Sequence, residues 1–431
     1  MPSLGLRRSP RHRLLRALLL IVSFLLILDL LTLLKYYRLF SRSLVLNTVK
    51  HKDDLPNAAR NQKIYICAQF WTNAAVINDH WGSALIELIQ TLGPENVYVS
   101  IYESGSLDNT KEVLRYLDYE LGNHNVQRTI TLDPTTHEDE VKVGPVDEHG
   151  QEREGWIKTS TPGVEKELRR IPYLAKLRNL SLKPMLDLQN SGMTFDRVLF
   201  LNDVVFRPSD VLSLLATNDG SYAAACAFDF HLPPAYYDTF ALRDSNGAGT
   251  VMSHFPYFRP SETLSAILRG EPARVQSCWN GMVAMEAAPF YPRQDTKALT
   301  FRGTPDSLAV KHLEGSECCL IHADLIIMGA ASRGIYINPT VRVGYVGKAY
   351  DYTHRDEDQK FVSTSQYVAG VWANRIVRWV HPTDSWQSAV RKRVKAWQAE
   401  GNELGQKREE LGEMCLIDET HILIWNGWKH V

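Results

Sequence analysis

The sequence predicts an α/β fold in which a mixed, mostly parallel sheet carries helices on both faces. Apolar runs typical of buried strands alternate with segments of helical spacing, beginning with a strand at 63–68, a helix at 76–92 and a second strand at 97–102. Strands and helices that alternate in this order build a doubly wound sheet. The chain has no G-x-G-x-x-G fingerprint, so the dinucleotide-binding version of this fold is not expected.

The composition is that of a globular protein. Of the 431 residues, 44% are hydrophobic and 23% are charged, and the net charge of −1 argues against nucleic acid as a partner. The six cysteines include no C-x-x-C pair, so a structural zinc site is not expected. Isolated disulfides remain possible in an oxidising compartment, and the sequence does not say which cysteines pair.

The N-terminus predicts a membrane anchor. Residues 17–34 are rich in leucine and long enough to cross a bilayer as a helix, although Asp29 interrupts them. Arginines precede this run in a predicted cytoplasmic tail, 1–16, and a stem at 35–60 follows it. We therefore expect a single-pass type II protein of the Golgi or another secretory membrane with a lumenal body, where the sequon at Asn179 could carry a glycan. A cleaved signal peptide is the alternative.

The stretch FLNDVVF at 200–206 gives the strongest indication of a site. Val198 to Leu201 is apolar on successive residues, as in a strand buried on both faces, and it ends at Asn202 and Asp203. Open α/β sheets bind ligands at the carboxyl ends of their strands. We expect Asp203 to bind a divalent metal and Asn202 to shape the turn beside the nucleotide. The alternative is that both residues only end a strand.

Glu103 and Arg178 are the other candidates for nucleotide binding. Glu103 follows the second strand at the same predicted edge of the sheet, where its carboxylate can accept hydrogen bonds from a ribose or a base. Arg178 lies on a predicted helix, 171–188, with Arg169, Arg170 and Lys176, and could hold phosphates. For each of them a solvated surface position is the alternative.

The candidate substrate-binding residues come later in the chain. A buried strand at 221–230 ends at Asp229, and the turn-rich segment 236–249 carries Asp238, Arg243 and Asp244. Trp279 could stack on a sugar ring and Asn280 could bond its hydroxyls, although a tryptophan is more often part of a core.

Taken together, five stretches resemble a family of fungal capsule-associated α-1,3-mannosyltransferases over 63–346. They read SIYESGSLDNT, FLNDVVF, YDTFALRDSNG, CWNGMVAMEAAPF and SECCLIHADL. The resemblance implies a GT-A-like domain at 61–350, a GDP-mannose donor, Mn²⁺ and retention of the anomeric configuration. It maps the metal role onto Asp203, with Glu317 as a catalytic carboxylate and His322 as a further metal ligand or a core histidine. Residues 351–431 are expected to form a helical extension.

The acceptor implied by the resemblance is a fungal glycan or glycolipid, and the oligomeric state is not predicted. Two alternatives remain at this point. One is a non-catalytic glycan-binding or assembly subunit with the same fold, and the other is a transferase that uses another nucleotide sugar.

Overall fold

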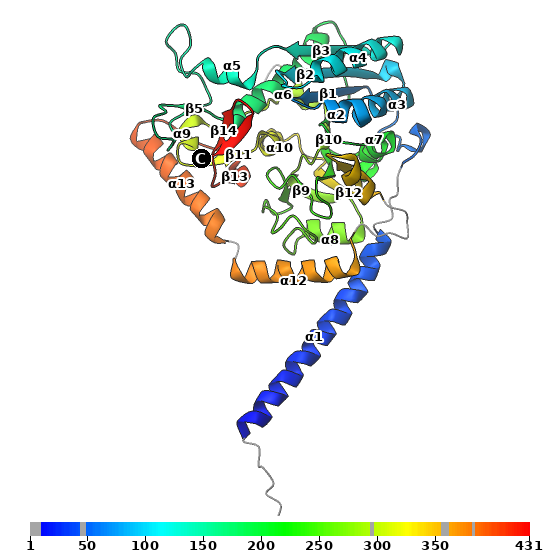
Figure 1. The fold of residues 1–431 in the computed structure, drawn as a ribbon, viewed down its shortest axis with the longest axis vertical. Helices are drawn as coiled ribbons and strands as arrows, with labels where there is room; N and C mark the ends of the chain where they lie inside the picture. The colour runs from blue at the N-terminus through cyan, green and yellow to red at the C-terminus, as the bar shows by residue number, and fades with distance from the viewer. Residues whose placement is uncertain (1–9, 44–48, 294–296, 355–361, 382–383) are drawn as a thin grey trace, which may run out of the picture.

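A nine-stranded sheet forms the centre of the computed structural model, which describes residues 10–43, 49–293, 297–354, 362–381 and 384–431 (Figure 1). The strand order is β3-β2-β1-β6-β10-β7-β12-β9-β8. The strands are β1 (Ile64–Phe70), β2 (Val97–Ser104), β3 (Gln127–Asp133), β6 (Arg197–Leu201), β7 (Ala224–Phe230), β8 (Arg243–Asp244), β9 (Ala273–Ser277), β10 (Met282–Glu286) and β12 (Ile335–Gly344).

The sheet is mixed, and one antiparallel strand lies in its middle. Strands β3, β2, β1 and β6 are parallel neighbours, and β12 is parallel to β7. Strand β10 runs antiparallel to both β6 and β7, so these two strands point the same way. Strands β9 and β8 complete the sheet as antiparallel neighbours. The predicted mixed, mostly parallel sheet is confirmed.

Helices cover both faces of the sheet because side chains alternate along each strand. In β1, Ile64 and Ile66 pack into one apolar cluster with α3 (Gly82–Leu92), α4 (Thr110–Asn123) and α7 (Pro208–Leu215). Tyr65 and Cys67 point to the other face, where they pack with α6 (Arg170–Asn190), α8 (Glu262–Arg269) and α10 (Glu317–Ile327). The two layers of helices leave the carboxyl edge of β1, β6 and β7 to the loops.

Shorter elements connect these layers. They are the 3₁₀ turns at 52–54, 94–96, 217–220, 288–290 and 413–415, the π-turn Ile77–Trp81, α2 (Ala74–Val76), α5 (His137–Lys142), β4 (Trp156–Ile157), β5 (Glu167–Leu168), α9 (Asp306–Ala309), β11 (Glu314–Gly315) and α11 (Gly347–Thr353).

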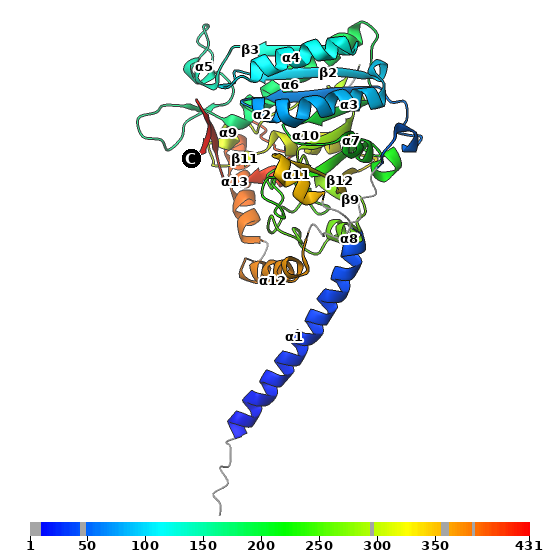
Figure 2. The same ribbon diagram turned by 45° about the vertical axis from the view of Figure 1, so that its right-hand side comes forward.

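Helix α1 (Pro10–Ser43) leaves the body at one side and is longer than the predicted span (Figure 2). Its segment Leu14–Arg38 is long and apolar enough to cross a membrane, with a mean hydropathy of 2.8 over an 18-residue window. The first nine residues of the predicted tail and residues 44–48 of the predicted stem lie outside the described residues. The rest of the stem continues α1 to Ser43 and then forms a 3₁₀ turn, Lys52–Asp54.

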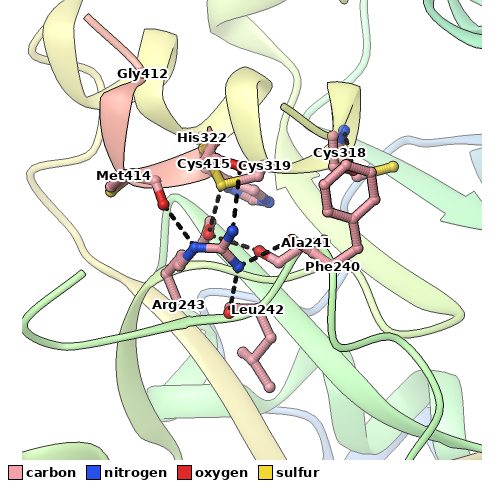
Figure 3. The surroundings of a disulfide bond; sticks show 12 residues. Phe240, Ala241, Leu242, Arg243, Cys318, Cys319, His322, Gly412, Met414 and Cys415 are labelled. Carbon is pink, nitrogen blue, oxygen red and sulfur yellow. Dashed lines mark hydrogen bonds between the residues drawn. A yellow bond between two sulfur atoms is a disulfide. The ribbon is translucent and has the colours of Figure 1, made fainter. Parts of the chain in front are cut away.

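The C-terminal part differs from the helical extension that the sequence predicts. Helices α12 (Thr364–Val380) and α13 (Asp384–Glu403) are followed by β13 (Leu416–Ile417), which pairs with β11, and by a hairpin of β14 (His421–Ile424) and β15 (Gly427–His430). A disulfide, Cys319–Cys415, ties this part to α10 (Figure 3). A second disulfide, Cys226–Cys278, links β7 to the segment before β10. The C-terminal residues therefore belong to the same body as the sheet.

The sequon at Asn179 is not presented for glycosylation. Asn179 lies inside α6, where its side-chain amide donates to the carbonyl of Phe301 at 2.8 Å and accepts from the Phe301 N–H at 2.9 Å. Because the amide nitrogen is engaged and part-buried, this expectation is corrected.

Candidate functional site

The topology gathers polar side chains at one edge of the sheet. The parallel strands β6 and β7 end there, which brings Asp203 and Asp229 to that edge. Strand β10 is antiparallel to both and so begins there, which places Trp279 and Asn280 between them. Tyr345, directly after β12, joins them because β12 is parallel to β7. This edge is where open α/β sheets bind ligands.

Asn202 and Asp203 form the turn after β6. The Asn202 N–H donates to the carbonyl of Gly281 at 3.0 Å, and its side-chain oxygen accepts from Trp279 Nε1 at 3.3 Å. Asp203 is part-buried, and its Oδ2 accepts from Asn73 Nδ2 at 2.8 Å. Burial raises the pKa of Asp203, against the opposing effects of Asn73 and the charge of Arg178. The ionised form of Asp203 is therefore short of compensating positive charge.

A second group of acids lies beside this turn. Asp229 is fully buried; its Oδ1 accepts from Asn280 Nδ2 at 2.9 Å, and its Oδ2 accepts from the Tyr345 hydroxyl at 3.0 Å. Burial and the neighbouring charge of Asp238 raise the pKa of Asp229 to about 7. Burial also raises the pKa of Asp238, which accepts from the N–H groups of Phe240 and Ala241. Two carboxyl groups in this setting hold a proton near neutral pH.

A cavity of about 1150 Å³ opens over this edge. Ligand pockets of about 300–1,000 Å³ accept drug-sized molecules, so this cavity has room for a nucleotide sugar and part of an acceptor. Its polar and aromatic lining includes Arg170, Arg178, Asn202, Tyr237, Asp238, Phe240, Arg243, Arg259, Trp279, Glu317, Tyr345, His381, Arg391, Glu413, Glu419, His421, Trp428 and His430. The C-terminal helices and hairpin thus supply one wall.

Arg178, Trp279 and Glu317 form one unit on the cavity wall. The guanidinium of Arg178 lies 4.4 Å from the centroid of the Trp279 ring, and its Nε donates to Glu317 Oε1 at 3.0 Å. Glu317 stands in the first turn of α10 and is 3% exposed. Trp279 is 2% exposed, one face of its ring is covered by Arg178, and its Nε1 bonds Asn202. Trp279 therefore supports Arg178 and Asn202. Because its ring is buried and covered by Arg178, the expectation that it stacks on a sugar is corrected.

Arg170 is a further cation at the cavity. It stands one residue into α6, and its guanidinium lies 4.6 Å from the centroid of the Trp428 ring. Burial lowers the pKa of Arg170, partly offset by the charge of Glu317. Among the described residues Arg170 forms no ion pair, unlike its neighbour Arg169, which pairs with Asp306 and Glu314. A half-buried, unpaired guanidinium on a cavity wall is suited to an anionic ligand.

Glu103 does not face the cavity. It is fully buried at the end of β2; its Oε1 accepts from the Ser106 N–H at 2.5 Å, and its Oε2 lies 2.5 Å from Lys111 Nζ. Both oxygens therefore fix the loop that leads into α4. The expectation that Glu103 binds the nucleotide is corrected, because its carboxylate is fully buried and is not among the residues that line the cavity.

Arg243 and Asp244 hold the chain rather than a ligand. Arg243 donates to the carbonyls of Phe240, Leu242, Met414 and Cys415, as Figure 3 shows, and so fastens the C-terminal segment beside its disulfide. Asp244 accepts from the N–H groups of Asn246 and Ala248, which closes a turn. Asn280 is buried and donates to Asp229, so it positions that carboxyl group. These three expectations of direct substrate binding are corrected.

His322 lies inside α10 and is fully buried. Its Nε2 contacts the carbonyl oxygen of Cys278 at 2.6 Å, beside the Cys226–Cys278 disulfide, and it is not part of the cavity lining. Burial lowers the pKa of His322 to about 4. It is the core histidine that the sequence left as an alternative, and the metal role is corrected.

Asp203 could supply one carboxylate ligand to a divalent cation, although it is not among the residues that line the cavity. The carboxylate has one oxygen held by Asn73 and lacks a full counter-charge, and a metal bound to a diphosphate takes one or two carboxylates from the protein. A second set of metal-ligand atoms lies at the cavity rim. There, Glu419 Oε2 is 2.8 Å from His421 Nε2 and 3.0 Å from His430 Nδ1.

Asp238, Tyr345 and Arg170 join the site. The sequence did not single out Tyr345, and it named Asp238 only within the turn-rich segment 236–249 and Arg170 only within a basic helix. Asp238 sits in a loop rich in turn residues, and only the return of that loop over β7 brings it to Asp229. A signal for Tyr345 existed: it directly follows the strand that closes the parallel part of the sheet, at the ligand-binding edge.

A mixed sheet of this order, with acids at its carboxyl edge below a large cavity, defines the class of GT-A-like α/β proteins that the resemblance implied. The model of the family described as cryptococcal mannosyltransferase 1 matches residues 63–324, and this chain belongs to that family.

One curated relative is an α-1,3-mannosyltransferase of Cryptococcus neoformans var. neoformans serotype D. It is 26% identical over 282 residues, which cover 61% of this chain and 53% of that protein, so the match spans about half of the relative's length.

Two solved structures are similar over most of the chain. A mannosyltransferase of Pyrobaculum calidifontis, solved in complex with GDP-Man and Mn²⁺, is 13% identical, covers 90% of this chain and 87% of its own, and has a TM-score of 0.34. Residues 1–349 of S. aureus TarS are 12% identical, cover 79% of this chain and 83% of their own, and have a TM-score of 0.37.

Proposed function

We propose that this protein transfers mannose from GDP-mannose to a hydroxyl of a mannose-containing glycan, forming an α-1,3 linkage with retention of configuration. The observation that carries the proposal is the cavity lined by Arg170, Arg178 and Asn202, the residue before Asp203, in a chain of the cryptococcal mannosyltransferase family. A diphosphate ester needs positive charge around its leaving phosphates, and the cavity offers it from Arg170 and Arg178 on α6.

Asp203 would hold a divalent cation, with Mn²⁺ as the expected ion, and Asn73 and Asn202 would fix the orientation of this turn. Such an ion supplies charge neutralisation to a leaving diphosphate as a Lewis acid. The chain itself binds and orients the donor. Arg178 faces the cavity because Trp279 supports its guanidinium and Glu317 fixes its Nε.

Glu317 therefore acts through Arg178, and its 3.0 Å ion pair favours this role over that of a nucleophile. An α-linked product from an α-linked donor requires retention, which either a double displacement or a front-side attack provides. Because Glu317 is paired with Arg178, we favour front-side attack, in which the acceptor oxygen bonds the anomeric carbon as its bond to the diphosphate breaks and the leaving phosphate takes the hydroxyl proton. Asp238 lines the cavity, where its carboxyl group can bond a sugar hydroxyl, and burial raises its pKa.

The expected setting is the lumen of the Golgi or another secretory compartment. The apolar segment of α1 supports a membrane anchor, and two disulfides support an oxidising compartment, because disulfides persist there and are rare in the cytosol.

The test is transfer by the full chain, purified in detergent, from GDP-mannose to an α-mannoside with Mn²⁺. We expect a product whose new linkage is α-1,3 by nuclear magnetic resonance. A panel of GDP-, UDP- and CMP-sugars in a thermal-shift assay identifies the donor, because a ligand that binds only the folded state raises the melting temperature. A shift with a UDP-sugar alone would assign another donor, and glycan binding without nucleotide binding would favour a non-catalytic subunit.

A further inference from the structure

Helix α12 carries an apolar face that the body of the protein does not cover. Ile376, Trp379 and Val380 are 50%, 69% and 64% exposed, and Ala369, two turns before Ile376, is exposed on the same face. Trp372, part-buried, lies between Ala369 and Ile376. The spacing of 369, 372, 376, 379 and 380 places these side chains on one side of an α-helix. A tryptophan at the edge of an apolar face is typical of the membrane interface.

The opposite face of α12 is firmly packed. Tyr367 stacks on Phe255 at 5.0 Å, and Asn374 donates to the carbonyl of Phe258 at 3.2 Å. A Cβ at Gly370 would lie 2.1 Å from the carbonyl oxygen of Phe255, so only glycine permits this approach. The exposed face is therefore held in a fixed orientation by the body.

Helix α12 touches α1 within the candidate membrane span. A guanidinium nitrogen of Arg375 lies 2.6 Å from Oδ2 of Asp29, the acid that interrupts the apolar run. The ring of Tyr367 packs edge-on against that of Tyr37, and the two ring centroids are 5.1 Å apart. Asp29 stands nine residues, or about 13 Å along the helix, before Arg38, where the span Leu14–Arg38 ends. A side chain of α12 thus reaches to a level of α1 that lies inside the span.

The arrangement of the two helices fits a bilayer surface. Figures 1 and 2 both show α12 on the side of the body from which α1 leaves. Arg375, which pairs with Asp29, lies beside the apolar face, and Lys35 and Arg38 are exposed at the end of the span. Apolar side chains flanked by cations are the composition of helices that lie in the plane of the interface, where the cations meet anionic headgroups.

The cavity reaches the same helix. Val377 of α12, His381 directly after it and Arg391 of α13 line the cavity. Part of the cavity wall is therefore built by the helix that carries the exposed apolar face.

We propose that α12 lies in the lipid–water interface of the membrane that α1 spans, and that it holds the cavity there to accept a glycan carried on a lipid. The position of α12 stands independently of any activity. The choice of a lipid-carried acceptor rests on the transferase function proposed above.

The first experiment places the full chain in phosphatidylcholine nanodiscs with and without doxyl-labelled lipid. An environment-sensitive fluorophore is attached at Ile376→Cys or Val380→Cys, and at Tyr116→Cys or Tyr119→Cys as matched controls, since both tyrosines are 65% exposed or more on α4. The free cysteines Cys67 and Cys318 are buried and compete little for label. We expect blue-shifted emission and at least twofold quenching at the α12 positions only. Equal, weak quenching at all four would overturn the position of α12.

The second experiment compares acceptors with the double variant Ile376→Asp/Trp379→Asp in nanodiscs. We expect KM for a lipid-linked mannoside in the same disc to rise at least tenfold, while KM for a soluble mannoside and kcat for both stay unchanged. Equal effects on the two acceptors would overturn the lipid-carried acceptor. Absence of transfer to either acceptor by the unaltered chain would refute the proposed function and this choice of acceptor, while the quenching result would still decide where α12 lies.

Discussion

Replacing Asp229 with asparagine should stabilise the protein above neutral pH. Asp229 is fully buried, and burial together with the charge of Asp238 raises its pKa from 3.8 to about 7. The folded state therefore keeps a proton that the unfolded state releases above pH 3.8. Between these two values the unfolded state binds fewer protons, so the contribution of Asp229 to stability falls as pH rises and is fully unfavourable above pH 7.

The size of the stability change follows from the difference between the folded and unfolded pKa values of Asp229. A difference of about three pH units corresponds to about 4 kcal/mol, at 1.36 kcal/mol per unit. Asparagine has nearly the same shape and keeps an oxygen that accepts from Asn280, so Asp229→Asn removes the charge and retains this hydrogen bond. We expect the free energy of unfolding to rise by up to about 4 kcal/mol at pH 8 and to change little at pH 4.

The assay is urea unfolding of the full chain in detergent with EDTA, followed by tryptophan fluorescence at pH 4 to 8. The control is Asp187→Asn, a carboxylate on the surface of α6 that is 60% exposed, for which we expect a change within about 0.5 kcal/mol at every pH. A loss of stability at pH 8 in Asp229→Asn, or a gain that does not depend on pH, would refute the assignment of Asp229 as a buried acid with a raised pKa.

Three further predictions concern the cavity. Arg170→Gln should weaken GDP binding about 10- to 100-fold in calorimetry, since a hydrogen bond to a charged group contributes about 1.5–3 kcal/mol. Arg170→Lys should recover part of the lost affinity. Unchanged affinity in Arg170→Gln would exclude Arg170 from the phosphate site. Cys415→Ser should lower the free energy of unfolding by about 2–5 kcal/mol, because it removes the disulfide to Cys319. A protease should then cleave the C-terminal segment faster than in the natural chain. Equal cleavage rates would contradict this prediction. Trp279→Ala should lower kcat through loss of support for Arg178 and cost about 3–5 kcal/mol in stability; a normal kcat would show that Arg178 is held without it.

The elements of the sheet could be predicted because buried parallel strands are continuous apolar runs. The run from Val198 to Leu201 became β6, and the acid after it came to the ligand-binding edge as expected. The direction of β10 could not be read from Met282–Glu286, because a five-residue apolar run carries no sign of which neighbours it pairs with. That reversal is what brings Trp279 and Asn280 to the edge.

The roles of single polar residues were harder to predict because they depend on partners that the sequence does not indicate. Glu103 looked available, but Lys111, the second residue of α4, pairs with its carboxylate. Arg243 looked like a donor to substrate, but the carbonyls of the C-terminal segment, more than a hundred residues later, occupy it. Spacing along the chain says nothing about such pairs.

The structure of the C-terminal part could also be predicted only in part from the sequence. Charged residues and helix formers indicated helices, and α12 and α13 are helices. The short strands after them are defined by their partners: β13 pairs with β11 next to the Cys319–Cys415 disulfide, and β14 pairs with β15. Strands of two to four residues give too little pattern to be recognised without their partners.

The central claim is that Asp203 binds the metal that holds the donor diphosphate. The measurement that tests it most directly is calorimetric titration of GDP-mannose into the full chain, with Mn²⁺ and with EDTA, for the natural sequence and for Asp203→Asn, which retains an oxygen that accepts from Asn73. We predict tight binding that requires Mn²⁺ in the natural chain, and in the variant at least tenfold weaker binding that Mn²⁺ does not improve, with the melting temperature in EDTA not lowered. Equal affinity and an equal Mn²⁺ requirement in the variant would contradict the account.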